Sequence, residues 1–261
     1  ELVTRMRQMG AEISVSSLRI RPLSEVVVQG LVESGTQTIS LAPEAGSQRL
    51  RQIINKGVTE DDIIKAIDQV ARQGIKYIKL YFMIGLPAET DDDIEELIRL
   101  TLFLKSRIER TGSRLSLTVE PFVPKASTPF QWMAMPQADI LNHRLKRVKS
   151  GLTRSGIEVR TESASWSIVQ GVLSRGDTRL GTALANMPGH SLSAWRQALD
   201  DCNLSAAFYV HRELPLDEPL PWSVVDSAVT PDYLREELEK SRQGIETPPC
   251  PPKDCHKCGV C

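Results

Sequence analysis

The sequence has no cysteine before Cys202, and four of its five cysteines fall within the last twelve residues. Disulfide scaffolds spread their cysteines along the chain in order to join distant loops, so this distribution argues against one. The N-terminus also lacks the charged and apolar regions of a secretory signal. We therefore expect a protein of the reducing cytoplasm.

Other absences exclude further classes. No apolar run approaches the length of a membrane span, so no membrane partner is expected. The net charge of -1 gives no global argument for binding nucleic acid. The chain contains no nucleophile elbow, Walker loop or dinucleotide fingerprint. The composition, with 41% hydrophobic and 25% charged residues, is typical of a globular protein. The length of 261 residues predicts one large domain or one domain with an appended module.

Strand-like and helix-like segments alternate through the first half of the chain. The pattern predicts strands at 12–19, 36–42, 75–84 and 115–122, and helices at 24–34, 47–55, 59–73 and 90–112. Such alternation predicts an α/β fold with a parallel sheet. Four strands are too few to close a barrel, so we expect a partial (βα) barrel over residues 1–132. A mostly helical extension is expected over 133–243, and a cysteine-rich tail over 244–261.

The segment 75–84 reads as a strand covered on both faces, because its apolar run is nearly continuous. Lys79 and Tyr81 share one face of it. A buried ammonium is costly without a partner, so Lys79 should pair with Glu44 or Glu120, or point into a cavity. Ligands of α/β folds usually bind after the carboxyl end of a strand, which here is the loop Gly85-Leu86-Pro87.

The tail is the strongest chemical signal that needs no comparison with a family. Its four thiols suit a tetrahedral zinc ion or an iron–sulfur cluster, and the sequence favours these two interpretations almost equally. Disordered thiols are the alternative. The ligand set predicted for the metal is Cys250, Cys255, Cys258 and Cys261.

The helix expected at 138–154 carries basic residues on one side. A solvated face is the simpler reading of such a charge run, and a face that binds RNA or phosphate is the alternative.

Several short motifs together resemble those of radical S-adenosylmethionine (radical SAM) enzymes, and most closely the branch with a cobalamin (B12)-binding domain. The motifs are Pro43-Glu44-Ala45-Gly46-Ser47, Asn55-Lys56-Gly57, Gly85-Leu86-Pro87-Ala88-Glu89-Thr90, Phe122-Val123-Pro124-Lys125 and Leu173-Ser174-Arg175-Gly176-Asp177. The resemblance implies a 4Fe–4S cluster on a Cys-x3-Cys-x2-Cys loop that cleaves SAM to a 5′-deoxyadenosyl radical. This sequence lacks that loop. We therefore expect a C-terminal fragment, inactive alone, whose primary cluster ligands and cobalamin lie upstream.

The resemblance also implies residues that form the SAM-binding wall. Glu44 would accept hydrogen bonds from a ribose hydroxyl or an amino group of SAM, although an exposed carboxylate near a helix start is the simpler reading. Gly46 would permit close backbone approach or merely a turn. Arg51 and Lys56 would meet the methionyl carboxylate, against a reading as exposed cations at a helix end. Lys79, Tyr81, Gly85, Leu86 and Pro87 complete the wall, and no catalytic residue is identified.

Three functions therefore stand. The first is the C-terminal part of a radical SAM enzyme, with SAM, an unknown substrate and an electron donor such as ferredoxin or flavodoxin as partners. The second is a zinc-tailed module that binds RNA or protein without catalysis, which leaves nucleic acid open as a partner. The third is an α/β-barrel lyase without a cluster.

Overall fold

The computed structural model describes residues 2–251 and 255–260. It divides into two compact units. The first unit takes in the chain up to Ile84, Glu89–Glu120 and Arg144–Thr161. The second unit takes in Gly85–Ala88, Pro121–His143 and the chain from Glu162 onward. Residues 144–161 thus return to the sheet, so the boundary expected at residue 132 does not coincide with the division that the packing produces.

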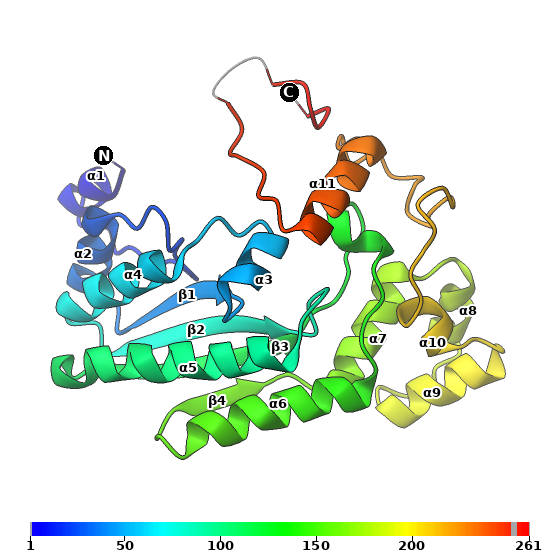
Figure 1. The fold of residues 1–261 in the computed structure, drawn as a ribbon, viewed down its shortest axis with the longest axis horizontal. Coiled ribbons are helices and arrows are strands. Elements are labelled where there is room, and N and C mark those ends of the chain that lie inside the picture. The colour runs from blue at the N-terminus through cyan, green and yellow to red at the C-terminus, as the bar shows by residue number, and fades with distance from the viewer. Residues whose placement is uncertain (1, 252–254, 261) are drawn as a thin grey trace. The chain divides into compact units, whose positions relative to one another are not determined.

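The first unit is an α/β structure with one four-stranded sheet in the order β1-β2-β3-β4 (Figure 1). Its strands are β1 (Thr38–Glu44), β2 (Tyr77–Ile84), β3 (Arg114–Pro121) and β4 (Glu158–Thr161). β1 pairs with β2 in parallel, and β3 pairs with β4 in parallel. The expected α/β fold with a parallel sheet is therefore confirmed.

Two strand predictions need correction. The segment 12–19 contributes one isolated bridge, between Leu18 and Leu41, in place of a strand. The fourth strand is instead β4, which the sequence pattern missed because three of its four residues are exposed and give no alternation.

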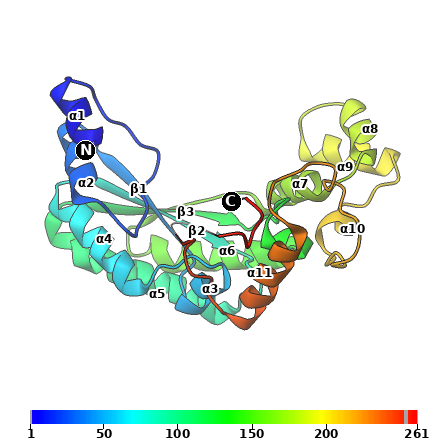
Figure 2. The same cartoon turned by 90° about the horizontal axis from the view of Figure 1, so that it is seen from above.

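Helices cover one face of the sheet (Figure 2). Amphipathic α4 (Glu60–Arg72) and α5 (Asp91–Ile108) bury residues such as Ile63, Ile67 and Leu97, and β2 buries Ile78 and Leu80. Both helices begin at a capping box, on Thr59 and on Thr90. The helices that belong wholly or partly to this unit are α1 (Leu2–Gln8), α2 (Glu25–Glu33), α3 (Gln48–Ile53), α4 (Glu60–Arg72), α5 (Asp91–Ile108), the 3-10 turn η1 (Glu109–Thr111) and α6 (Ala138–Thr153).

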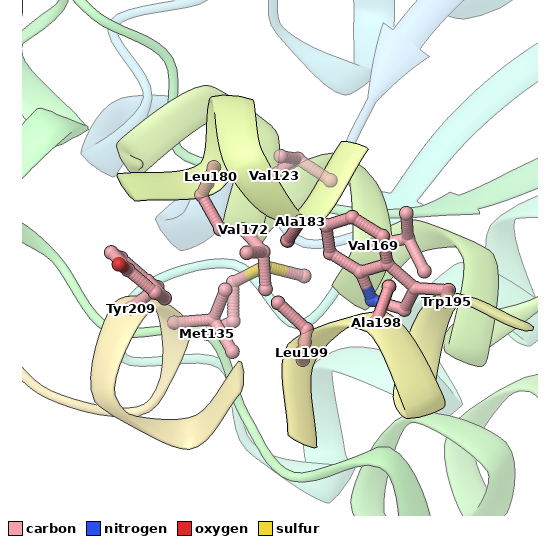
Figure 3. Packing of buried hydrophobic residues seen from close by; sticks show 11 residues of the cluster. Val123, Met135, Val169, Val172, Leu180, Ala183, Trp195, Ala198, Leu199 and Tyr209 are labelled. Carbon is pink, nitrogen blue, oxygen red and sulfur yellow. The ribbon is translucent and has the colours of Figure 1, made fainter. Parts of the chain in front are cut away.

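The second unit contains helices and has its own core. Met135 lies among the apolar side chains of several helices, including Val172, Leu180 and Leu199 (Figure 3). A smaller cluster gathers Trp132, Leu214, Leu234 and Leu238. Its elements are η2 (Pro129–Trp132), α7 (Ala164–Arg175), α8 (Arg179–Ala185), α9 (Leu192–Asp201), α10 (Ala206–Val210) and α11 (Pro231–Gln243). Among the described residues, no helix has the length and apolarity needed to cross a bilayer.

Candidate functional site

The carboxyl ends of β1 and β2 lie side by side, since Glu44 is in register with Phe82. The pairing is irregular between Leu41 and Glu44, and Glu44 adopts a left-handed backbone with φ of +68°. A non-glycine residue in this conformation is uncommon and often marks a functional site. The backbone of the first unit is therefore irregular at the carboxyl ends of its strands, which is where ligands bind in α/β folds.

Glu44 forms an ion pair with Lys56. The ammonium Nζ of Lys56 donates to Oε1 of Glu44 at 3.0 Å, and the side chains are 29% and 27% exposed. Lys56 stands in the turn after α3, between Asn55 and Gly57, which are both left-handed. The sequence assigned both residues to one site, and the structure brings them together while leaving each open to solvent.

Arg51 is fully buried. The sequence predicted either contact with the methionyl carboxylate or an exposed cation at a helix end, and neither interpretation included burial. Its guanidinium donates to the carbonyl oxygens of Ala45, Gly46 and Val58 and to the side chain of Gln48. Burial lowers the pKa of Arg51 from its ordinary value, with smaller contributions from nearby charges. Because it donates to these protein oxygens, Arg51 shapes the turn after β1, and its direct contact with a ligand stays a prediction.

Gly46 is explained by packing. A Cβ at this position would lie 2.2 Å from the Cα of Leu97, a backbone atom of α5. The backbone at Gly46 therefore approaches α5 closely, and its close approach to SAM stays a prediction.

Asp93 organises the site, and the sequence analysis did not single it out. Its buried carboxylate accepts from the hydroxyl of Ser47 at 2.5 Å, from Arg49, and from the backbone and hydroxyl of Thr90 at 2.8 and 2.9 Å. Burial acts to raise the pKa of Asp93, but these hydrogen bonds outweigh it and lower the pKa below its ordinary value. Asp93 thus ties the segment after β1 to the first turn of α5.

Lys79 and Tyr81 lie on the sheet face opposite the helices, as their spacing predicts. The ammonium of Lys79 lies 5.0 Å from the centre of the Tyr81 ring, a cation–π contact. Glu44 is paired with Lys56, so the predicted pairing of Lys79 with Glu44 is not formed. Lys79 is half-buried, and the high cost that motivated a carboxylate partner does not apply.

The same face carries an unsatisfied polar group. The hydroxyl of Thr118 is buried and has no hydrogen-bond partner among the described residues. Thr118 is in register with Arg160 of β4. The alternation of residues along β3 was a sequence signal that could have placed Thr118 on this face. Arg160 could be placed there only by recognising β4.

The loop Gly85-Leu86-Pro87 belongs to the second unit and directly follows β2 in the chain. Gly85 is left-handed with φ of +77°, and a Cβ there would lie 2.6 Å from Leu141. Leu86 is buried and Pro87 is half-buried. Glycine is therefore required at residue 85 by both conformation and space.

The basic helix α6 is engaged in ion pairs. Arg144 donates to Oε2 of Glu89 at 2.8 Å and to the backbone oxygen of Glu89 at 3.0 Å. Arg147 binds Glu95 of α5 through two hydrogen bonds. Lys146 and Lys149 are exposed. The face that would contact RNA thus retains fewer unpaired charges than the sequence suggests.

Three of the four tail cysteines lie within the described residues. Cys250 is exposed, and Cys255 and Cys258 are half-buried. Among the described residues, no three His, Cys, Asp or Glu side chains form a group that can hold a metal ion. Cys261 lies outside the described residues, so the four-cysteine site stays a prediction.

Comparisons with known proteins agree with the motifs. The model of the radical SAM superfamily matches residues 1–101, which include β1, the Glu44–Lys56 pair and β2. The chain is 39% identical over 185 residues to the "Uncharacterized protein MJ0966" of Methanocaldococcus jannaschii, covering 70% of this chain and 39% of that protein. It is 30% identical over 100 residues to the "Uncharacterized methyltransferase PH0819" of Pyrococcus horikoshii, covering 38% of this chain and 22% of that protein. The chain thus matches well under half the length of either relative.

Among solved structures, one of D-psicose 3-epimerase with D-tagatose from Clostridium cellulolyticum H10 aligns over 94% of this chain and 93% of that one. Its TM-score is 0.34 at 14% sequence identity, so the likeness carries no inference about fold or substrate.

Proposed function

We propose that the first unit is the SAM-binding portion of a radical SAM enzyme and that its sheet belongs to a partial barrel. The observation that carries this proposal is the Glu44–Lys56 ion pair at the carboxyl end of β1, within the residues that the superfamily model matches. Its position follows the rule that ligands bind beyond the carboxyl ends of parallel strands.

The pair suits the amino-acid end of SAM. That end is a zwitterion, with an ammonium group and a carboxylate on one carbon atom. Glu44 can accept from the ammonium while Lys56 donates to the carboxylate, and both side chains are partly exposed at 3.0 Å from each other. A ligand that bears both charges can replace each half of the ion pair without leaving either charge unmatched.

Neighbouring residues hold this arrangement in place. Arg51 binds the carbonyl groups of Ala45 and Gly46, which directly follow Glu44. On the open face of the sheet, the ammonium of Lys79 and the hydroxyl of Thr118 can donate to oxygen atoms of a bound molecule. Tyr81 supplies an aromatic surface beside Lys79.

The residues of the matched segment do not fit an iron–sulfur cluster, since residues 1–101 contain no cysteine. A 4Fe–4S cluster requires thiolate ligands. We therefore propose that another part of a longer protein supplies them, and that this chain alone binds SAM without cleaving it. The substrate, a ferredoxin or flavodoxin donor and upstream cobalamin belong to the same proposal.

Titration calorimetry with SAM and with methylthioadenosine, which lacks the amino-acid end, tests the assignment. Glu44→Gln and Lys56→Met should each weaken SAM binding about tenfold, as expected for loss of one charged hydrogen bond. Methylthioadenosine binding should stay unchanged. If Glu44→Gln weakens methylthioadenosine equally, Glu44 contacts the ribose instead. If wild-type chain does not bind SAM, the proposal fails.

The cysteine tail supports a second proposal, an accessory metal site. The backbone of Thr230 donates to the carbonyl oxygen of Cys258 at 2.8 Å, which fixes this part of the tail at the start of α11. The pKa of Tyr233 is raised by burial, by Glu237 and, more weakly, by Cys258 and Cys250.

Metal analysis and the visible spectrum of anaerobically purified protein distinguish the candidates. Iron with sulfide absorption indicates a cluster, whereas a colourless protein with zinc indicates a zinc site. Purified protein with neither metal, and none taken up on reconstitution, would contradict the proposal. Retention of RNA by zinc-loaded protein would favour the module that binds RNA without catalysis.

A further inference from the structure

A cavity of about 370 Å³ lies within the second unit, and none of its lining residues is among those assigned to SAM. Its lining includes three arginines from separate segments: Arg175 at the end of α7, Arg179 at the start of α8, and Arg212 just after α10. Gly176 permits this convergence, because a Cβ there would lie 1.9 Å from the side chain of Leu180 in α8. The chain therefore gathers three guanidinium groups around one cavity.

Arg175 is the unusual member. It is 3% exposed, and its two terminal nitrogens donate to the backbone oxygens of Val210 and Arg212 at 3.2 and 2.9 Å. Its Nε has no hydrogen-bond partner among the described residues. Burial and the charge of Arg212 lower the pKa of Arg175 to about 10, with a smaller opposing effect from exposed Glu213. Arg175 is thus a buried cation at neutral pH that the described residues neutralise only at a distance, which is normally costly.

The other two arginines have carboxylate partners. Arg179 binds Asp177 through Nε and Nη2. Nη1 of Arg212 lies 3.5 Å from Oε2 of Glu218, and its guanidinium lies 4.3 Å from the centre of the Phe208 ring. Three guanidinium groups therefore face two carboxylates in the lining. One positive charge remains, and it is the charge of Arg175.

The rest of the wall is mostly apolar. It includes Phe208, Leu214 and the segment Pro219-Leu220-Pro221. The ring of Tyr209 packs at the edge of the apolar core, with its hydroxyl directed away from the cluster (Figure 3). That hydroxyl lies 3.4 Å from both carboxylate oxygens of Asp177. A ligand that fits this cavity carries one negative charge and an apolar body.

We propose that this cavity binds a small monocarboxylate with an apolar body, whose carboxylate is held by Arg175 and Arg212. The planar guanidinium group matches a carboxylate through paired hydrogen bonds. The single charge of the ligand cancels the single excess charge of the lining, and the proline-rich wall receives the apolar body. No residue of this lining is assigned to SAM, so we expect Glu44→Gln and Lys56→Met to leave binding in this cavity unchanged.

Benzoate is the probe, and benzamide is its uncharged counterpart of nearly the same shape. Titration calorimetry on the full chain should detect benzoate binding with a dissociation constant of about 1 mM or tighter and no binding of benzamide at that concentration. Arg212→Gln should weaken benzoate binding about tenfold. Arg235→Gln is the matched control, because Arg235 also binds a carboxylate, Asp232, and a backbone oxygen, and should bind benzoate like the wild type.

Arg175→Met separates a ligand-binding arginine from a structural one. This variant should lose benzoate binding, and its melting temperature should change little, because removal of a buried cation offsets the loss of the donor to the carbonyl oxygens of Val210 and Arg212. Benzoate should raise the melting temperature of the wild type and leave that of Arg175→Met unchanged.

Four results would overturn the proposal. They are equal binding of benzamide, absence of benzoate binding, unchanged affinity in Arg212→Gln, and wild-type affinity for benzoate in a folded Arg175→Met variant. Tighter binding of inorganic phosphate than of benzoate would replace the carboxylate with a phosphate ligand.

Discussion

The hydroxyl of Ser47 donates a 2.5 Å hydrogen bond to the carboxylate of Asp93, although 46 residues separate them in the chain. Ser47 also caps α3, and Asp93 completes the capping box of α5. One buried carboxylate therefore fixes the starts of two helices relative to each other. The turn that carries Glu44 lies just before Ser47, so its geometry depends on this contact.

Asp93→Asn should lower the free energy of unfolding by about 2 kcal/mol, because charged hydrogen bonds from Arg49, Ser47 and Thr90 are lost or weakened. Urea denaturation provides the measurement. Asp92→Asn, an exposed neighbour in the same turn, is the control and should change stability by less than about 0.5 kcal/mol. Equal effects of the two substitutions would contradict a special role for Asp93.

The stability conferred by Asp93 should depend on pH. Its pKa is lower in the folded state than the ordinary value of 3.8, so the unfolded state binds the proton more readily. The contribution is complete above pH 3.8 and is lost as the pH falls through the folded-state pKa. The stability difference between wild type and Asp93→Asn should therefore be constant at neutral pH and shrink in acid. The wild type must be compared with Asp93→Asn because Asp62 also has a lowered pKa, which adds its own pH dependence to the stability of both proteins. A gap that widens in acid would refute this assignment.

Gly46→Ala should destabilise the protein by about 3 kcal/mol, since the new Cβ would meet backbone atoms of Leu97 at 2.2 and 2.4 Å. Gly181→Ala in α8 is the control, because a Cβ added there would have no neighbour within 4 Å, and a helical alanine is favoured by about 1 kcal/mol. Thermal unfolding compares them. Normal stability with lost SAM affinity in Gly46→Ala would indicate instead that Gly46 admits a ligand.

Arg51→Met should cost about 3 kcal/mol, because buried carbonyl groups of Ala45, Gly46 and Val58 lose their donor. Arg72→Met, at an exposed position in the last turn of α4, should stay within about 0.5 kcal/mol of the wild type. Chemical denaturation of both variants gives the comparison. A stable Arg51→Met variant with weakened SAM binding would place Arg51 in the ligand wall.

The long elements could be predicted because their signals are local. The strand expected at 75–84 is observed as Tyr77–Ile84, and the caps expected at Thr59 and Thr230 accept hydrogen bonds from the helices they precede. The strand β4 escaped prediction because it is short and exposed and depends on pairing with β3. Pairing with β3 stabilises β4, because its own sequence has no alternating strand pattern.

The candidate site was predictable in its position and less so in its contacts. Glu44 and Lys56 could be placed near a strand end from glycine, proline and helix-start signals. The burial of Arg51 could not, because it results from three carbonyl groups that converge only in the folded chain. Thr90 and Asp93 have the spacing of a capping box, but their connection to Ser47 and Arg49 is a long-range contact without a local signal.

Glu44 and Lys56 are proposed to recognise the zwitterionic end of SAM. The most direct test exchanges the two residues, combining Glu44→Lys with Lys56→Glu, and measures the affinities for SAM and methylthioadenosine together with the melting temperature. Because the exchange keeps an ion pair and reverses its direction, we expect an unchanged melting temperature, unchanged methylthioadenosine binding and SAM binding weakened about tenfold or more. Wild-type affinity for SAM in the exchanged protein would contradict the claim.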